Sequence, residues 1–229
     1  MEESGKQKKR GGEVTKVTIF PVPFALGEIK ENITTNNPSK PSKEQIINQA
    51  FKFHSQGNIS EAAKYYKSII DQGFIDHQVF TNYGNIKKSL GQLNEAEKLY
   101  EKAIETKPDY ETAYFNKGII LKQLGKFKEA QLSYQKAIKL NPDFAEAHLN
   151  FANLLRDLGQ LKEAELSNRK AIEIKPDYAE AFSNLGNVLK DLNNLQEAEL
   201  STRKAIELNP DFAIVHFNLG NILRDLGKL

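Results

Sequence analysis

Asparagine recurs along the chain at a spacing of 34 residues, and side-chain amides in such columns could bind a polymer. Each amide offers two N–H donors and an acceptor oxygen, so a column of them suits the main chain of an extended peptide. The first column consists of Asn48, Asn82, Asn116, Asn150, Asn184 and Asn218. The second column, interrupted by Phe51 and Ile119, consists of Asn85, Asn153, Asn187 and Asn221. We predict that they bind a protein or peptide; the alternative is that they only satisfy nearby backbone.

A column of basic residues follows the second asparagine column by about one helical turn. It consists of Lys88, Lys122, Arg156, Lys190 and Arg224, with His54 at the equivalent place in the first interval. The last three basic residues are each followed directly by an aspartate: Asp157, Asp191 and Asp225. We therefore predict that Lys88 and Lys122 are uncompensated and that an acidic side chain or a C-terminal carboxylate binds near them. The alternative is a self-paired, solvated face that contributes little.

No residue pattern indicates catalysis. The chain contains no cysteine, so thiolate ligands and cysteine nucleophiles are excluded. The histidines, at positions 54, 77, 148 and 216, lack metal-ligand spacing and are expected in a core or at its rim. The sequence has no glycine-rich phosphate loop, nucleophile elbow or HExxH motif. We predict a protein that is not an enzyme, with no catalytic residue, no metal site and no cofactor.

Helices must position these columns, because the apolar residues between turn signals have helical spacing. His148, Phe151 and Leu155 fall on one face of such a helix, and Leu149 falls with Asn150 on the opposite face. Turn residues recur in register and fit left-handed helix ends: Gly57, Gly91, Gly125, Gly159, Asn193 and Gly227. Prolines precede aspartates that we expect to cap the next helix: Asp109, Asp143, Asp177 and Asp211. Glu146 and Glu180 would complete capping boxes.

Small residues recur with the same spacing, which allows paired helices to approach closely. One small column consists of Ala62, Ala96, Ala130, Ala164 and Ala198, and another of Ala50, Gly84, Gly118, Ala152, Gly186 and Gly220. A 34-residue helix-turn-helix unit with this pattern and a closing proline resembles the tetratricopeptide repeat. The resemblance implies an all-α, right-handed superhelical solenoid. It also implies that the asparagine and basic columns line a concave groove.

The resemblance divides the chain into a tail and a repeat array, residues 43–229. We place the units at 43–76, 77–110, 111–144, 145–178 and 179–212, with a half unit at 213–229. Residues 1–42 are rich in polar residues, glycine and proline, and we expect a mostly disordered, flexible tail. Its apolar segment 14–26 could instead dock on the array or on a partner.

Charge and hydropathy exclude two classes of partner. Of the 32 Lys/Arg and 30 Asp/Glu residues, seven and five lie in residues 1–42, which leaves 25 of each in the array. A formally neutral array argues against nucleic acid as a partner, because phosphates demand an excess of cations. No stretch approaches the roughly 20 apolar residues that span a bilayer, and no signal peptide is recognisable. We expect no membrane partner and a cytoplasmic location.

The second helices carry two further signals. Leu132, Leu166 and Leu200 should point away from the core, forming either a convex contact strip or three isolated leucines. Tyr66, Tyr100 and Tyr134 are replaced by Asn168 and Thr202 in later units, which predicts weaker packing between the C-terminal repeats.

The end of the sequence bears on which functions we expect. The chain stops at Leu229 inside a turn, so we expect the far side of the last helix, including Leu219 and Leu223, to be exposed. The strings NLGN at 184–187 and 218–221 resemble the repeat arm of O-linked N-acetylglucosamine transferases. Our first prediction is a non-catalytic scaffold that binds an extended peptide in the groove. The alternatives are the recognition arm of a truncated glycosyl-, sulfo- or methyltransferase, and self-association through the uncapped last helix.

Overall fold

The computed structural model describes residues 41–229, which form eleven α-helices and no strand. The helices are α1 (Lys43–Ser55), α2 (Ile59–Asp71), α3 (His77–Ser89), α4 (Leu93–Thr106), α5 (Glu111–Gln123), α6 (Phe127–Leu140), α7 (Ala145–Asp157), α8 (Leu161–Ile174), α9 (Ala179–Asp191), α10 (Leu195–Leu208) and α11 (Ala213–Asp225). The prediction of an all-α helical solenoid is confirmed. Residues 1–40, which include most of the predicted tail and all of segment 14–26, lie outside the described part.

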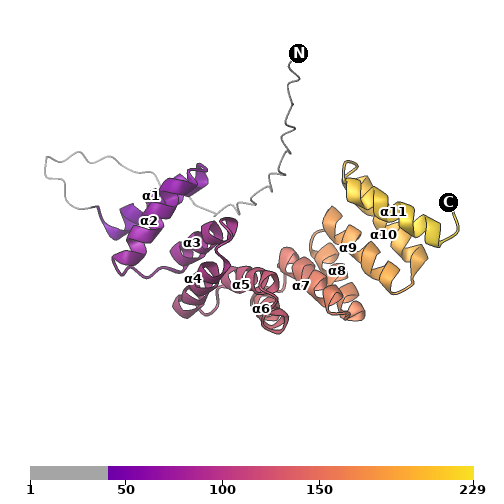
Figure 1. Ribbon diagram of the computed structural model, residues 1–229, viewed down its shortest axis with the longest axis horizontal. Coiled ribbons are helices and arrows are strands. Elements are labelled where there is room, and N and C mark those ends of the chain that lie inside the picture. The colour runs from indigo at the N-terminus through magenta and orange to yellow at the C-terminus, as the bar shows by residue number, and fades with distance from the viewer. Residues whose placement is uncertain (1–40) are drawn as a thin grey trace, which may run out of the picture.

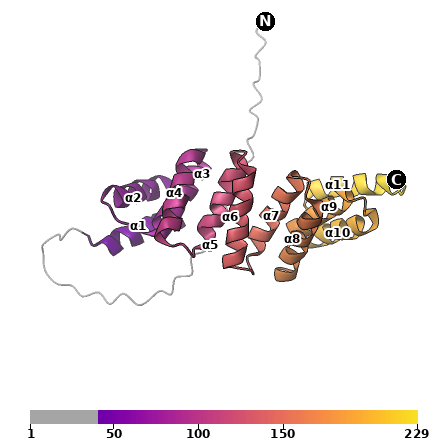
Figure 2. The same ribbon diagram turned by 90° about the horizontal axis from the view of Figure 1, so that it is seen from below.

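Consecutive helices pack as hairpins, and the hairpins stack into a curved row. Each odd-numbered helix from α1 to α9 packs on the helix that follows it, and each second helix contacts the first helix of the next hairpin. From α3 onward, the odd-numbered helices also contact one another in succession. They lie along the inner side of the bend and the even-numbered helices along the outer side (Figure 1); Figure 2 shows the same row turned by 90°. The concave surface is therefore built from the first helices.

The turn inside each hairpin has the left-handed backbone that the sequence predicts. φ is positive at Gly57, Gly91, Gly125, Gly159 and Gly227. Asn193 takes the same place in the fifth hairpin with φ of 60°, and it is the one non-glycine residue with positive φ in residues 41–229. Asparagine adopts this region more readily than other residues with a Cβ, so the sequence retains the turn without glycine.

The predicted aspartate caps between hairpins are wrong. The N-cap of α7 is Phe144 rather than Asp143, and Glu146 completes no capping box. The N–H of Phe144 donates to the carbonyl of Asn141 at 3.2 Å, and its half-buried ring packs against the core. Full burial of such a ring stabilises by about 1.5 to 3 kcal/mol, so partial burial already offsets the roughly 1 kcal/mol of a cap. The N-caps at the other three junctions are likewise aromatic, Tyr110, Tyr178 and Phe212, in place of Asp109, Asp177 with Glu180, and Asp211.

Leu149 belongs to the packing between repeats and not to the groove face, which corrects the helical-wheel assignment. It is 7% exposed and packs against Ala171 of its own hairpin and Ala181 of the next first helix. The other inner members of its column are buried too: Ile47, Thr81, Phe115 and Ser183. A wheel drawn for one helix cannot separate a face covered by the next repeat from a face open to solvent.

The last helix, α11, exposes a different set of apolar residues from those predicted. Leu219 and Leu223 are half-buried, whereas Ile214 and Phe217 are 54% and 65% exposed. Phe217 is the α11 member of the Leu149 column. Because α11 contacts only α9 and α10, no further helix covers the Phe217 ring in the described part of the chain.

Candidate functional site

The predicted site residues all lie on the first helices, which form the concave surface (Figure 1). Most of the asparagines are half-buried; Asn48 is exposed and Asn116 is buried. The basic residues of the column are half-buried from Lys88 to Lys190, and Arg224 is exposed. The structure therefore brings both kinds of column to one side of the curved row.

The asparagines of the two columns have different hydrogen-bond partners. Asn85 accepts a hydrogen bond from the hydroxyl of Tyr100 at 2.8 Å, and the Asn150 amide donates to the carbonyl of Glu146 at 2.9 Å. The buried Nδ2 of Asn116 donates to no residue of the described part. Some of these amides thus stabilise the hairpins, and others keep their hydrogen-bonding capacity.

The basic column forms a diagonal ladder of ion pairs, each reaching an aspartate of the next first helix. Lys122 Nζ lies 2.7 Å from Asp157, Arg156 Nε lies 2.6 Å from Asp191, and Lys190 Nζ lies 3.3 Å from Asp225. The prediction that Lys122 is uncompensated is therefore wrong. The partner lies 35 residues ahead, not beside the cation in sequence, and only the stacking of successive helices brings the two together.

Lys88 is the exception in this ladder. The residue 35 positions ahead of it is Gln123, which carries no charge. Lys88 is half-buried and has no ion pair with any residue from 41 to 229, and burial lowers the pKa of its ammonium. The described concave surface therefore has one partly desolvated cation without a counter-charge.

A buried hydroxyl and an imidazole lie at the N-terminal end of the same surface. Nδ1 of His54, which takes the place of the basic residue in the first hairpin, lies 3.0 Å from the hydroxyl of Tyr66. Burial lowers the pKa of His54, which favours the neutral ring, and raises the pKa of Tyr66. The sequence placed His54 in the column correctly but gave no sign of its tyrosine partner on α2.

Family models match the part of the chain in which the hairpins repeat. Models of the tetratricopeptide repeat match residues 112–144 and 179–212, 84–125 and 152–193, and 133–165 and 202–229. Together these matches run without a gap from residue 84 to residue 229. The chain belongs to the tetratricopeptide-repeat family. A comparison with curated protein sequences finds no significant match.

Solved tetratricopeptide-repeat structures have the same arrangement of hairpins. YrrB, described as a TPR protein with an unusual peptide-binding site, is 25% identical, with a TM-score of 0.66 over 77% of this chain and 91% of YrrB. A repeat protein from Parabacteroides merdae ATCC 43184 is 22% identical, with a TM-score of 0.69 over 81% of this chain and 74% of that chain. MamA is 21% identical, with a TM-score of 0.65 over 75% of this chain and 93% of MamA.

Two histidines of this tetratricopeptide-repeat array hydrogen-bond the segment that precedes their helix. Nε2 of His148 donates to the carbonyl of Pro142 at 3.0 Å, and Nε2 of His216 donates to that of Pro210 at 2.8 Å. Across residues 41–229, no cluster of three or more His, Asp or Glu side chains could hold a metal ion. None of the described helices is both long and apolar enough to cross a membrane.

Proposed function

We propose that this tetratricopeptide-repeat protein is a non-catalytic scaffold that binds an extended segment of a partner protein along its concave surface. We propose further that Lys88 receives a carboxylate of that segment. The transferase arm and the self-association through residues 213–229 stay predictions from the sequence.

The interrupted ion-pair ladder carries the assignment of Lys88. Lys122, Arg156 and Lys190 already interact with an aspartate of the next repeat. A carboxylate that approaches them gains little unless it displaces that aspartate. At Lys88 the incoming carboxylate supplies the first counter-charge, and a charge-assisted hydrogen bond to a partly buried ammonium is among the stronger polar contacts.

The asparagine columns support an extended ligand that continues along the same concave surface. The side chains of Asn153 on α7 and Asn187 on α9 are half-buried and make no hydrogen bond to other described residues, so their amides are available to a peptide main chain. Asn116 of α5, the helix that contacts α3, is 1% exposed, so its unpaired Nδ2 is covered by the protein and is not open to a ligand.

The similarity to other repeat proteins supports a role in binding protein partners. YrrB has a peptide-binding site on a row of hairpins of the same fold. The polar columns of this chain lie on the inner helices of such a row. Neither observation identifies the ligand, so the carboxylate preference depends on Lys88 alone.

We would test the proposal with a pair of matched peptides and ¹⁵N-labelled protein. The probes are acetyl-Ala-Ala-Glu-Ala-Ala-amide and the same peptide with glutamine in place of glutamate. We expect the glutamate peptide to perturb amide signals on α3 and α5 near Lys88 and Gln123. We expect it to bind about tenfold more tightly than the glutamine peptide, the size of one charge-assisted hydrogen bond.

Two substitutions make the test specific. Gln123→Asp gives Lys88 an aspartate partner like those of Lys122, Arg156 and Lys190. We expect this variant to bind the glutamate and glutamine peptides equally well. Asp157→Asn removes the ion-pair partner of Lys122. We expect the glutamate peptide then to perturb amide signals near Lys122 on α5 as well. Equal affinity of both peptides for the unmodified protein would contradict the carboxylate site, and the absence of any response on the first helices would contradict the concave surface.

A further inference from the structure

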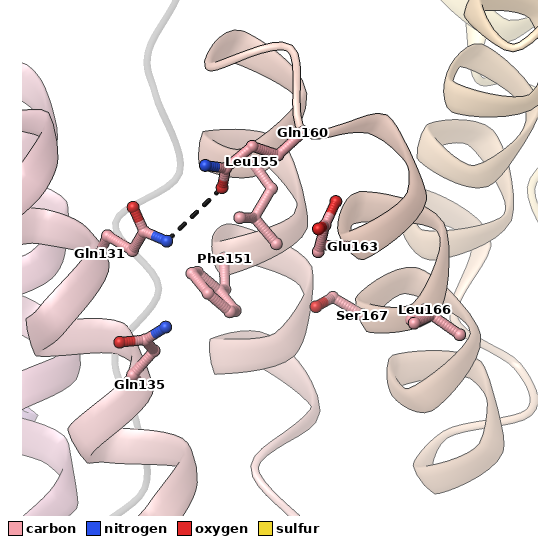
Figure 3. A pocket seen from close by; sticks show the side chains of 8 residues that line it. All are labelled: Gln131, Gln135, Phe151, Leu155, Gln160, Glu163, Leu166 and Ser167. Atoms are coloured by element: carbon pink, nitrogen blue, oxygen red, sulfur yellow. Dashed lines mark hydrogen bonds between the residues drawn. The ribbon is translucent and has the colours of Figure 1, made fainter.

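A pocket of about 380 Å³ opens on the convex side, between α6 and α8. Gln131 and Gln135 of α6 form one wall, and Phe151 and Leu155 of α7 form the floor (Figure 3). The other wall consists of Gln160, Glu163, Leu166 and Ser167. The pocket lies between second helices, so it is separate from the concave surface and independent of the function proposed there.

Corresponding positions at the preceding junction of second helices are closed by ion pairs. Lys126, the N-cap residue of α6, pairs with Glu97 of α4 at 2.9 Å, and Lys117 of α5 pairs with Glu101 of α4 at 2.8 Å. In the next repeat these four positions hold Gln160, Gln131, Phe151 and Gln135. Charge is therefore replaced at every one of the four positions, and the junction is left open.

The following junctions are also occupied by charged groups. Between α8 and α10, Arg169 bridges Glu165 and Glu197 at 2.9 and 2.5 Å. At the last junction, Lys228 pairs with Glu199 at 2.5 Å. The junction between α6 and α8 has only the contact between Gln131 Nε2 and Gln160 Oε1, at 3.5 Å, the upper limit of a hydrogen bond (Figure 3). Such a contact is easily exchanged for contacts to a ligand.

The lining residues combine an apolar floor with neutral polar walls. Leu155 is buried, Phe151 is half-buried, and Leu166 at the rim is 67% exposed. The three glutamine amides offer donors and acceptors that can pair with both groups of a peptide unit. The volume is at the lower end of the range for small-ligand sites and suits one large apolar side chain.

Charge at the rim narrows the choice of ligand. Glu163 has no ion-pair partner within residues 41–229, whereas the nearby Glu165 and Glu197 both pair with Arg169. No cation lines the pocket. An acidic ligand is therefore disfavoured, and a basic residue beside the inserted side chain complements Glu163.

We propose that this convex pocket is a second protein-binding site, and that it binds a partner segment in which a phenylalanine or leucine is followed by a lysine or arginine. The apolar side chain enters between Phe151 and Leu166. The adjoining main chain hydrogen-bonds the glutamine amides, which exchange their mutual contact for contacts to the ligand. The basic side chain lies at Glu163.

Two capped dipeptides, acetyl-Phe-Lys-amide and acetyl-Phe-Glu-amide, test the pocket in ¹⁵N-labelled full-length protein. We expect the lysine dipeptide to shift the side-chain amide signals of Gln131, Gln135 and Gln160, with weak binding of the kind expected for a small ligand. We expect the glutamate dipeptide to bind at least about threefold more weakly, because it meets Glu163. The absence of shifts at these glutamines at saturation, or shifts confined to the first helices, would overturn the proposal.

Variants that copy residues of neighbouring repeats show whether binding depends on the pocket itself or on any change of the convex surface. Gln131→Glu with Gln160→Lys recreates the Glu97–Lys126 pair and should close the pocket, reducing affinity by about tenfold or more. Leu166→Lys places at the rim the residue found at positions 64 and 98, and should weaken binding several-fold. Leu132→Lys is the matched control, because Leu132 is equally exposed but does not line the pocket. Equal effects of the two leucine substitutions would contradict the site.

Discussion

One position near the start of the first helices holds a tyrosine or histidine ring that donates a hydrogen bond to the preceding loop. Tyr114, His148 and His216 each donate to the carbonyl of the proline six residues earlier, at 3.3, 3.0 and 2.8 Å. The position therefore accepts a phenol or an imidazole as donor. Only the imidazole can also take up a proton near neutral pH.

We expect His148→Tyr to make stability less sensitive to acid. Burial lowers the pKa of His148 below 6.5, so the unfolded chain binds the proton more tightly than the folded chain. Its contribution to stability is thus present above about pH 6.5 and is lost as the pH falls through and below that value. Urea unfolding midpoints at about pH 7.5 and 5.5 should differ less in the variant than in the unmodified protein.

His216→Tyr is the control for that measurement. His216 makes the same hydrogen bond, but the residue is exposed. We expect the replacement to leave the difference between the two midpoints nearly unchanged. An equal effect of both substitutions would show that the burial of His148 is not the cause.

The columns of the sequence predicted the residue types of the candidate site but not their partners. The fixed spacing was enough to place the basic residues on one face. It could not show that Lys122 reaches Asp157, or that Lys88 meets the uncharged Gln123, because those pairs depend on the offset between successive helices. The convex pocket was missed for the same reason, since its walls come from two repeats.

At the scale of the helix, the N-cap residues show where packing between helices outweighs the local preference for an aspartate cap. Asp76 caps α3 by accepting from the N–H groups of Gln78 and Val79 at 2.9 and 3.0 Å. Asp143, which follows a proline, does not cap α7, because the N-cap position is taken by Phe144, whose half-buried ring packs against the core. The sequence predicts the repeat because the apolar periodicity is present in every unit. It does not predict each N-cap, because a cap depends on a single contact.

In the second and third hairpins, the tyrosine of the second helix lies directly against the glycine of the first helix. A Cβ on Gly118 would lie 2.7 Å from Cε1 of Tyr134, and one on Gly84 would lie 2.7 Å from Cε1 of Tyr100. The fourth hairpin has Ala152 with Asn168 instead. The first hairpin has Ala50 with Tyr66, whose hydroxyl lies near His54.

We expect Gly118→Ala to destabilise the protein by about 1 to 3 kcal/mol, the usual cost of overpacking. In a Tyr134→Asn background, which copies the fourth hairpin, the same change should cost less than about 0.5 kcal/mol. A double-mutant cycle in urea measures the coupling. Equal costs in both backgrounds would mean that the ring of Tyr134 moves aside without loss and that the coupling is absent.

At the scale of the whole molecule, the array presents two different surfaces from the same repeat. On the inner helices, the basic residues Lys122, Arg156 and Lys190 each pair with an aspartate of the next repeat, whereas Lys88 has no counter-charge among the described residues. From α4 onward, ion pairs bridge the junctions along the outer side, except between α6 and α8. Each proposed site is therefore a place where a residue change interrupts a regular ladder and leaves groups that a partner can bind.

Stacking also predicts that equivalent residues differ in their contribution to stability along the row. Leu149 and Phe217 occupy the same column, but Leu149 is 7% exposed between two repeats and Phe217 is 65% exposed on α11. Ser183 stands in this column naturally, so serine is compatible with the local backbone. We expect Leu149→Ser to cost about 2 to 5 kcal/mol, because it leaves a cavity between hairpins. Phe217→Ser should cost less than about 1 kcal/mol.

Hydrogen exchange followed by mass spectrometry distinguishes the two outcomes along the chain, because each repeat contacts only its neighbours. Leu149→Ser should speed exchange in α7, α8 and α9 and leave α1 to α4 unchanged. Phe217→Ser should leave the exchange of α7 to α9 unchanged. A uniform increase across all helices after Leu149→Ser would instead show that the array unfolds as one cooperative unit, in which local contacts act on the stability of every repeat.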